Sequence, residues 1–115
     1  MAIARGAGTE IIRSAQFEYE AANTTATNLL IGVQHHIYTI ISIIFCDNQA
    51  AAGTLGIRMN DGSNDIAIVD AHAHAAYATF IFSDKFVLEE DDDLEVYNSG
   101  THGDWIISYI DQDWT

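Results

Sequence analysis

Apolar side chains at alternate positions of residues 29–45 limit what this chain can fold into more than any other feature. Even positions such as Gln34, His36 and Ser42 are polar, whereas the odd positions are apolar except for His35 and Thr39. The apolar odd positions are Leu29, Ile31, Val33, Ile37, Ile41, Ile43 and Phe45. A period of two places successive side chains on opposite faces of a strand. The stretch therefore predicts two consecutive half-buried strands, or one long bent strand, rather than a helix.

The same pattern recurs along the chain and predicts about eight strands. Besides those in residues 29–45, we expect strands at residues 9–20, 54–60, 66–69, 77–82, 85–89, 94–97 and 105–111. The dipeptide Asp61-Gly62 between two apolar runs is a strong hairpin signal, and residues 21–27 and 71–78 are predicted loops. Even strand spacing of this kind favours an all-β fold, a single antiparallel β-sandwich or jelly roll over residues 9–115. The small residues and glycines of residues 1–8 predict a short flexible N-terminal arm.

Composition narrows the possible partners. A chain of 115 residues, 49% of them hydrophobic, is typical of one domain with one core. Seventeen acidic residues against four basic ones give a net charge of -13, which argues against nucleic acid and against anionic membranes as partners. Arg5, Glu10 and Arg13 interrupt the apolar residues of the N-terminus, and no run of 18 apolar residues occurs, so we expect neither a signal peptide nor a transmembrane helix.

The proline and cysteine contents of the chain bear on its edge strands and on its core. The chain contains no proline, so its edge strands lack one common protection against pairing with other chains. Charge, or burial in an assembly, must then supply that protection. The single cysteine, Cys46, cannot form an intramolecular disulfide and is predicted to be a small buried hydrophobe.

Several clusters have the composition of metal sites without the full spacing. The acidic run of residues 89–95 is read as a solvated hairpin tip, and the oxygen-rich residues 60–65 are read as a turn, because neither has the spacing of an EF-hand loop. His72 and His74 would share one side of a strand and could bind a divalent metal if a third ligand came from elsewhere. The candidates for that third ligand are His102, Asp70, His35 and His36. We predict no metal and no cofactor, and the five histidines leave open a pH-sensitive interface.

Catalytic motifs are missing from the sequence. Ser42, Ser83 and Ser108 lie in or beside apolar strands without a nucleophile elbow, and we predict a non-enzymatic protein with no catalytic residues. Among seventeen acidic residues, some pair of carboxylates can always lie at the separation that a glycosidase needs, so their number is no evidence for such an enzyme. A carbohydrate-binding face built from Trp105, Trp114 and Tyr97 is an alternative binding function.

Two parts of the chain resemble a known group of proteins. Residues 1–13, MAIARGAGTEIIR, resemble the N-termini of small virion proteins in marine tailed bacteriophages. Residues 86–97, FVLEEDDDLEVY, and residues 108–112, SYIDQ, look like the strand-turn-strand and the closing strand of small β-sandwich phage proteins. The resemblance implies a virion component, made in the host cytoplasm.

Among virion roles, a compact domain without a fibrous repeat favours a capsid decoration or cement protein on the capsid surface. Such proteins are often homotrimers, and their partner is the major capsid protein, whose shell they stabilise by binding only its assembled form. The arm and the strand that begins at Thr9 would reach the neighbour, by strand addition or packing. The expected contact residues are Ile3, Arg5, Ile11 and Arg13. The alternative is a receptor-binding or carbohydrate-binding module on the tail or a fibre.

Overall fold

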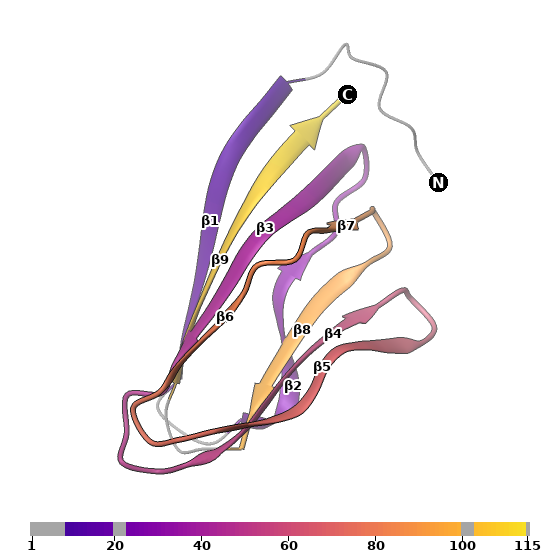
Figure 1. Cartoon of the computed structure of the whole chain (residues 1–115). Helices are drawn as coiled ribbons and strands as arrows, with labels where there is room; N and C mark the ends of the chain where they lie inside the picture. Colours follow the sequence, from indigo (N-terminus) through magenta and orange to yellow (C-terminus); the bar gives the residue numbers. More distant parts are fainter. Residues whose placement is uncertain (1–8, 20–22, 100–102, 115) are drawn as a thin grey trace.

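The computed structural model describes residues 9–19, 23–99 and 103–114, which form nine strands in two antiparallel sheets (Figure 1). The predicted arm, residues 1–8, lies outside the described residues. The strands are β1 (Thr9–Tyr19), β2 (Asn23–Ile31), β3 (His36–Cys46), β4 (Gly53–Asn60), β5 (Asp65–His74), β6 (Thr79–Phe82), β7 (Phe86–Leu88), β8 (Asp93–Asn98) and β9 (Gly103–Asp113). The all-β prediction is confirmed.

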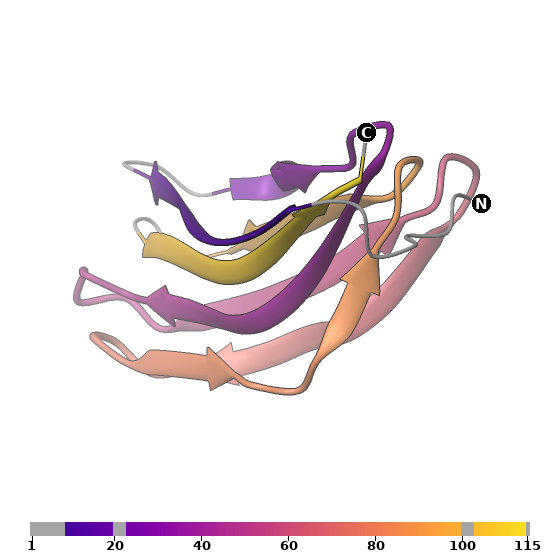
Figure 2. The same cartoon turned by 90° about the horizontal axis from the view of Figure 1, so that it is seen from above.

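The chain passes repeatedly from one sheet to the other, as in a jelly roll. The first sheet has the order β1-β9-β3-β6, and β7 also pairs with β3, whereas the second has the order β2-β8-β4-β5. Because β6 and β7 pair with successive parts of β3, they form one strand interrupted at residues 83–85. The predicted count of about eight strands is confirmed on this basis. Figure 2 looks onto the first sheet with the second sheet behind it, and both bend along their strands.

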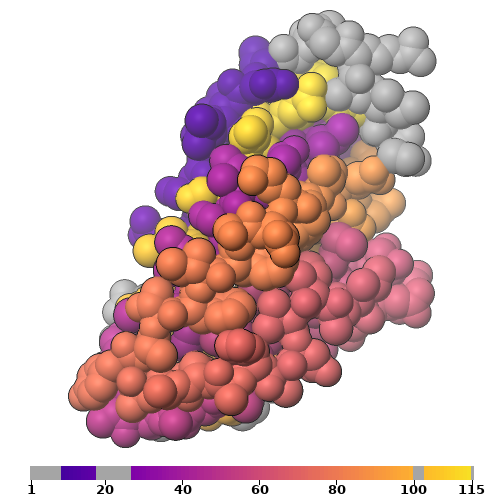
Figure 3. Space-filling model, in the orientation of Figure 1, coloured from indigo at the N-terminus to yellow at the C-terminus, as the bar shows by residue number. Residues whose placement is uncertain are grey.

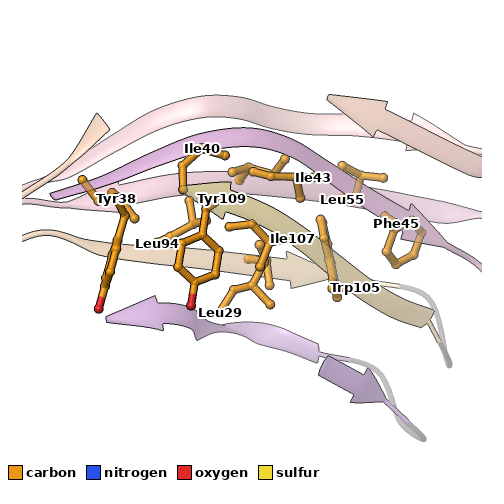
Figure 4. Close-up of a cluster of buried hydrophobic side chains, with 13 residues drawn as sticks. Leu29, Tyr38, Ile40, Ile43, Phe45, Leu55, Leu94, Trp105, Ile107 and Tyr109 are labelled. Carbon is orange, nitrogen blue, oxygen red and sulfur yellow. The ribbon is translucent and has the colours of Figure 1, made fainter. Parts of the chain in front are cut away.

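The core lies between the two sheets and is built from the inward rows of both. Trp105, Ile107 and Tyr109 of β9 point inward with Ile43 and Phe45 of β3 (Figure 4). Leu55, Ile57, Leu94 and Val96 of the second sheet are fully buried opposite them. In Figure 3 the segment from β6 to β7 covers the side in view, beside β3 and the β4–β5 hairpin.

A β-bulge changes which residues of β3 reach the core. The register with β9 shifts between Ile40 and Ser42, so that Ile41 is an extra residue. Before this bulge the buried residues are Tyr38 and Ile40, and after it they are Ile43 and Phe45. The expectation that the odd positions share one buried face is therefore wrong for Ile37 and Ile41 in β3, and Ile31 and Val33 are exposed near the turn that precedes it.

The strand predictions hold with two exceptions. Residues 29–45 form two strands with a turn between them, and Gly62, with φ of 95°, lies in the predicted hairpin turn. Residues 23–27 are not a loop, because β2 begins at Asn23. Residues 71–74 are not a loop either, since β5 continues to His74. Cys46 is half-buried rather than buried, because it alternates with the inward Phe45 at the end of β3.

Candidate assembly surface

The two sheets end in four edges, formed by β1, the β6–β7 strand, β2 and β5. An exposed strand edge offers unpaired backbone groups to other chains, and proteins usually disrupt such edges. The β6–β7 edge is interrupted at residues 83–85, which include Asp84 and Lys85. The register between β2 and β8 shifts twice along its length. These two edges are poor templates for another strand.

A bulge disrupts the β5 edge. The register between β5 and β4 shifts between Leu55 and Ile57, and Ala71 in this region has a φ of 48°. The backbone N–H of Ala71 donates a hydrogen bond to the phenol oxygen of Tyr97, at 2.9 Å. The same phenol donates to the Asp70 carboxylate at 3.3 Å. Bulges held in this way twist an edge away from pairing.

Strand β1 differs from the other described edges because it is long and regular. Its 11 residues pair with β9 in continuous register from Thr9 to Tyr19, without a bulge. Ile12 is 76% exposed and Ile11 is 46% exposed. A long edge strand in continuous register, with exposed isoleucines, is suited to adding a strand from another chain. We therefore take the β1 edge as the candidate assembly surface.

The structure places two of the four expected contact residues on this edge. Ile11 and Arg13 lie on the inward row of β1, opposite Asp111 and Tyr109 of β9. Arg13 interrupts the apolar row, as the sequence indicates, and its Nε lies 3.0 Å from Asp111 Oδ2. Its side chain remains 48% exposed, so Arg13 is anchored at one end and accessible from solvent. Ile3 and Arg5 lie outside the described residues.

Asp111 is the centre of a polar cluster at this end of the sandwich. Its side chain is 7% exposed, and its second oxygen lies 2.6 Å from Nδ1 of His36. Nε2 of His36 is 3.8 Å from the Asp113 carboxylate. The rings of Tyr38 and Tyr109 pack edge to face beside it at 5.1 Å. Burial raises the pKa of both phenols above the ordinary value of 10.0, and the Asp111 carboxylate raises the pKa of Tyr38 further.

A second polar cluster is enclosed by the core. Nε2 of His74 lies 2.9 Å from Oδ1 of Asn98, and its Nδ1 lies 3.5 Å from the carboxylate of Asp47. All three residues are buried, and the ring of Phe45 lies 5.1 Å from the imidazole. His74 and Asn98 are the last residues of β5 and β8, and Asp47 directly follows β3, so the cluster joins the ends of these three strands. The sequence offered no signal for it, because Asp47, His74 and Asn98 are far apart along the chain.

Both histidine clusters orient an imidazole but show no nucleophile in hydrogen-bond contact with it. In the described part of the chain, the rings of His36 and His74 contact carboxylates, an amide and a backbone carbonyl. Such contacts position a ring and hold strands together.

The clusters considered for metals are used in other ways. Within residues 9–19, 23–99 and 103–114, no three His, Cys, Asp or Glu side chains are grouped to hold a metal ion. His72 packs on Phe80 at 4.6 Å, and both ring nitrogens of His74 have protein contacts. His35 packs edge to face on Trp114, and His102 lies outside the described residues.

The two oxygen-rich turns bind their own backbone. Oδ1 of Asp61 accepts the N–H groups of Ser63 and Asn64, and these hydrogen bonds hold the pKa of its carboxyl below the ordinary value. In the acidic turn, Asp92 Oδ2 accepts the N–H of Glu89. Gly32 packs so close to the carbonyl oxygens of this turn that a side chain there would overlap them. The turn is thereby fixed to the end of β2.

The three aromatic residues considered for carbohydrate binding do not form one face. Trp105 is fully buried against Phe45, with ring centroids 4.8 Å apart. Tyr97 lies over β4 on the second sheet, and Trp114 packs against His35. The structure therefore does not bring Trp105, Trp114 and Tyr97 together as a stacking platform. Among the described residues, no helix has the length and apolarity needed to cross a membrane.

Comparison with known proteins extends the description of the fold. No protein-family model matches the chain, and no curated protein matches its sequence. A protein of the Bacillus endospore appendages, which form disulfide-linked pili, matches 100% of this chain and 97% of its own, with a TM-score of 0.57 and 14% identity. A protein of infectious bursal disease virus, strain Gx, matches 90% of this chain with a TM-score of 0.50 and 14% identity. This chain spans about a third of that viral protein, 32% of its length.

These likenesses show the fold. The solved structures that share this β-rich fold include a virus protein and a pilus protein. At 14% identity they do not carry a function over to this chain.

Proposed function

We propose that this chain is a non-enzymatic structural subunit of a virion, specifically a capsid decoration protein that binds the assembled shell and stabilises it. The single observation that carries the proposal is β1, a regular 11-residue edge strand with exposed isoleucines, while the other described edges are disrupted. A protein that keeps one edge open while disrupting the rest is suited to joining a neighbour at that edge. Attachment to the assembled shell stabilises it by mass action.

The fold supports an assembly role. Virus particles and pili are both regular assemblies, and proteins from both share the fold of this chain. The net charge of -13 supports a place on the outside of a particle, where like charge keeps particles apart. The acidic turn of residues 89–92 follows β7, which is separated from β1 in the first sheet by β9 and β3, so the turn can face solvent while β1 is engaged.

The cysteine content favours a virion role over a disulfide-linked pilus. A subunit inside a disulfide-linked filament must be joined to two neighbours and therefore needs at least two cysteines. These 115 residues contain one, Cys46. A filament joined through these residues alone would need another kind of link.

The contact residues in the proposal are Ile3, Arg5, Ile11 and Arg13. Ile11 supplies apolar area beside the β1 backbone. Arg13, fixed through Nε by Asp111, presents the rest of its guanidinium at the edge for an acid on the shell protein. The homotrimer implied by the resemblance belongs to the same proposal, as a head-to-tail contact between copies that closes into a ring.

Immunogold electron microscopy of the virions, with an antibody against the purified chain, tests this function. Gold on the head supports capsid decoration. Gold on the tail or fibres would instead favour the receptor-binding alternative, and unlabelled virions would contradict both. Co-sedimentation with shells then tests the edge: Ile11→Asp should weaken binding, whereas the same change at Ile66, an exposed residue of the second sheet, should not.

A further inference from the structure

The outer face of the first sheet carries a second, separate surface. Residues directly opposite each other in antiparallel strands have their side chains on the same face. Because Trp105, Ile107 and Tyr109 point into the core, the alternate residues of β9 point outward. Each outward residue of β9 is paired with residues of β1 and β3, and some of these β3 residues are paired with the β6–β7 strand. The paired residues form rows on the outer face of the sheet.

Three successive rows lack any charged residue, and we call them the uncharged face. The first row is Ile12, Ile110, Thr39 and Val87; the second is Ser14, Ser108 and Ser42; the third is Gln16, Ile106, Ile44 and Ile81. Six of these residues are isoleucine or valine. Ile12, Ile81, Val87 and Ile106 are 76%, 62%, 45% and 40% exposed. Charges appear beyond the outer rows, at Glu10 and Asp104, and at the edge of the middle row, where Asp84 and Lys85 of the link between β6 and β7 are exposed.

The outer face of the second sheet has the opposite character. Arg58 pairs there with Glu95 at 2.9 Å and lies 3.6 Å from Asp65. Tyr97 and Asp70 add a phenol and another carboxylate. An ordinary solvent-facing sheet looks like this one, whereas exposed apolar faces mark sites where proteins bind. The two outer faces of one sandwich therefore have different roles.

Charge indicates what covers the uncharged face. Two copies of a chain with a net charge of -13 repel each other over most of their surfaces. On this face no like charges meet, and apolar side chains are buried on both sides. A two-fold contact requires one patch to fit against itself, and apolar rows without charge can pack against a second copy of the same rows. A second copy is thus a suitable occupant, and this face is where two copies can approach.

The size of the face fits a weak, concentration-dependent pair. Three rows extend about 20 Å along the strands and four strands are about 19 Å wide, which gives each copy a face of about 400 Å². Two copies together would bury about 800 Å², the size of a weak or transient contact rather than of a permanent one. Sheets packed face to face in this way lie about 30° apart in strand direction.

We propose that the uncharged face packs against the same face of a second copy of the chain, in a two-fold pair. The pairing does not depend on the virion role, because β1 adds a strand at its edge and this contact uses the face. A two-fold contact makes particles with an even number of copies. The purified chain is therefore a dimer, or a hexamer where the proposed three-fold ring also forms.

Sedimentation velocity of the full 115-residue chain, over a wide range of concentration, tests this pairing. The expected mass is two or six times that of the 12.6 kDa chain. Ile106→Glu places a charge in the third row and should halve the particle mass. Ile81→Glu, at a more exposed position in the same row, provides a second test if Ile106→Glu disturbs folding.

The matched control is Ile66→Glu, which makes the same change at a position of similar exposure, 45% against 40%, on the other sheet. This variant should keep the wild-type mass, and circular dichroism should show all three variants folded. A wild-type monomer or trimer at every concentration would overturn the pairing, as would equal dissociation of the Ile66→Glu control. Loss of shell binding with the pair intact would contradict the proposed function alone.

Discussion

A glycine and a tyrosine illustrate how single residues prepare the surfaces of this molecule. Gly56 of β4 lies beneath the ring of Tyr97, and a side chain at this position would overlap the ring. With Gly56 in place, the Tyr97 phenol reaches the bulge of β5 and bonds to Ala71 and Asp70. One missing side chain therefore allows a tyrosine to hold the disrupted edge of β5.

Gly56→Ala should lower the free energy of unfolding by about 1–3 kcal/mol, because the added methyl displaces the Tyr97 ring. Urea denaturation followed by tryptophan fluorescence measures the change. In a Tyr97→Ala background the same glycine substitution should cost much less, since the ring is no longer there. Equal costs in the two backgrounds would contradict this account.

Trp105 shows why a residue type alone does not identify a binding face. Its ring is fully buried between Phe45 and the rest of the core, so Trp105→Ala should cost about 3–5 kcal/mol of stability. Thermal unfolding followed by circular dichroism measures this loss. A stable, folded Trp105→Ala protein would contradict the packing described above.

At the scale of elements, local alternation predicts strands well where one face is apolar, as in β1 and β9. It failed at residues 23–27, whose Thr, Asn and Ala side chains give an edge strand no apolar row to recognise. It failed again at residues 71–74, where alanine and histidine alternate in the bulged strand β5. The bulge at Ile41 changed the buried face of β3, because an extra residue in a strand has no signature in periodicity.

The sequence predicted only part of the candidate assembly surface, because local alternation reveals a strand but not its neighbours. β1 could be predicted as a strand from its local alternation of side chains. Its regularity compared with the other edges could not be predicted, because strand order depends on pairing between distant segments. Asp111, which holds Arg13, lies almost a hundred residues away along the chain, a separation of 98.

The buried cluster around His74 belongs to this scale, because it ties β5 to the ends of β3 and β8. His74→Leu removes the partner of the buried Asp47 carboxylate and should lower the stability by about 2–3 kcal/mol. Guanidinium denaturation measures the loss. His72→Leu, on the same strand but exposed, is the matched control and should change stability little. Equal losses in the two variants would show that the cluster does not stabilise the strand ends.

For the whole molecule, charge and apolar area are separated in space. The second sheet and the turns carry charged groups, whereas the outer face of the first sheet has three rows without any. The open β1 edge borders this face, so the two surfaces are adjacent but use different chemistry: backbone hydrogen bonds at the edge and side-chain packing on the face. A chain with both can join neighbours in two directions, which is what a lattice or a ring of pairs requires.

The two buried tyrosines make the stability of the whole fold sensitive to alkaline pH. Burial raises the pKa of Tyr38 and Tyr109 above 10.0, so the folded chain favours the neutral phenols. The unfolded chain ionises its tyrosines first, near pH 10, and each ionisation favours unfolding. This contribution to stability is therefore complete below about pH 10 and is lost as the pH rises through the higher folded pKa. Absorbance at 295 nm should show two late-titrating phenols, and the Tyr38→Phe, Tyr109→Phe double variant should lose them together with the steepest part of its alkaline unfolding. An unchanged alkaline limb in that variant would mean that other groups cause it.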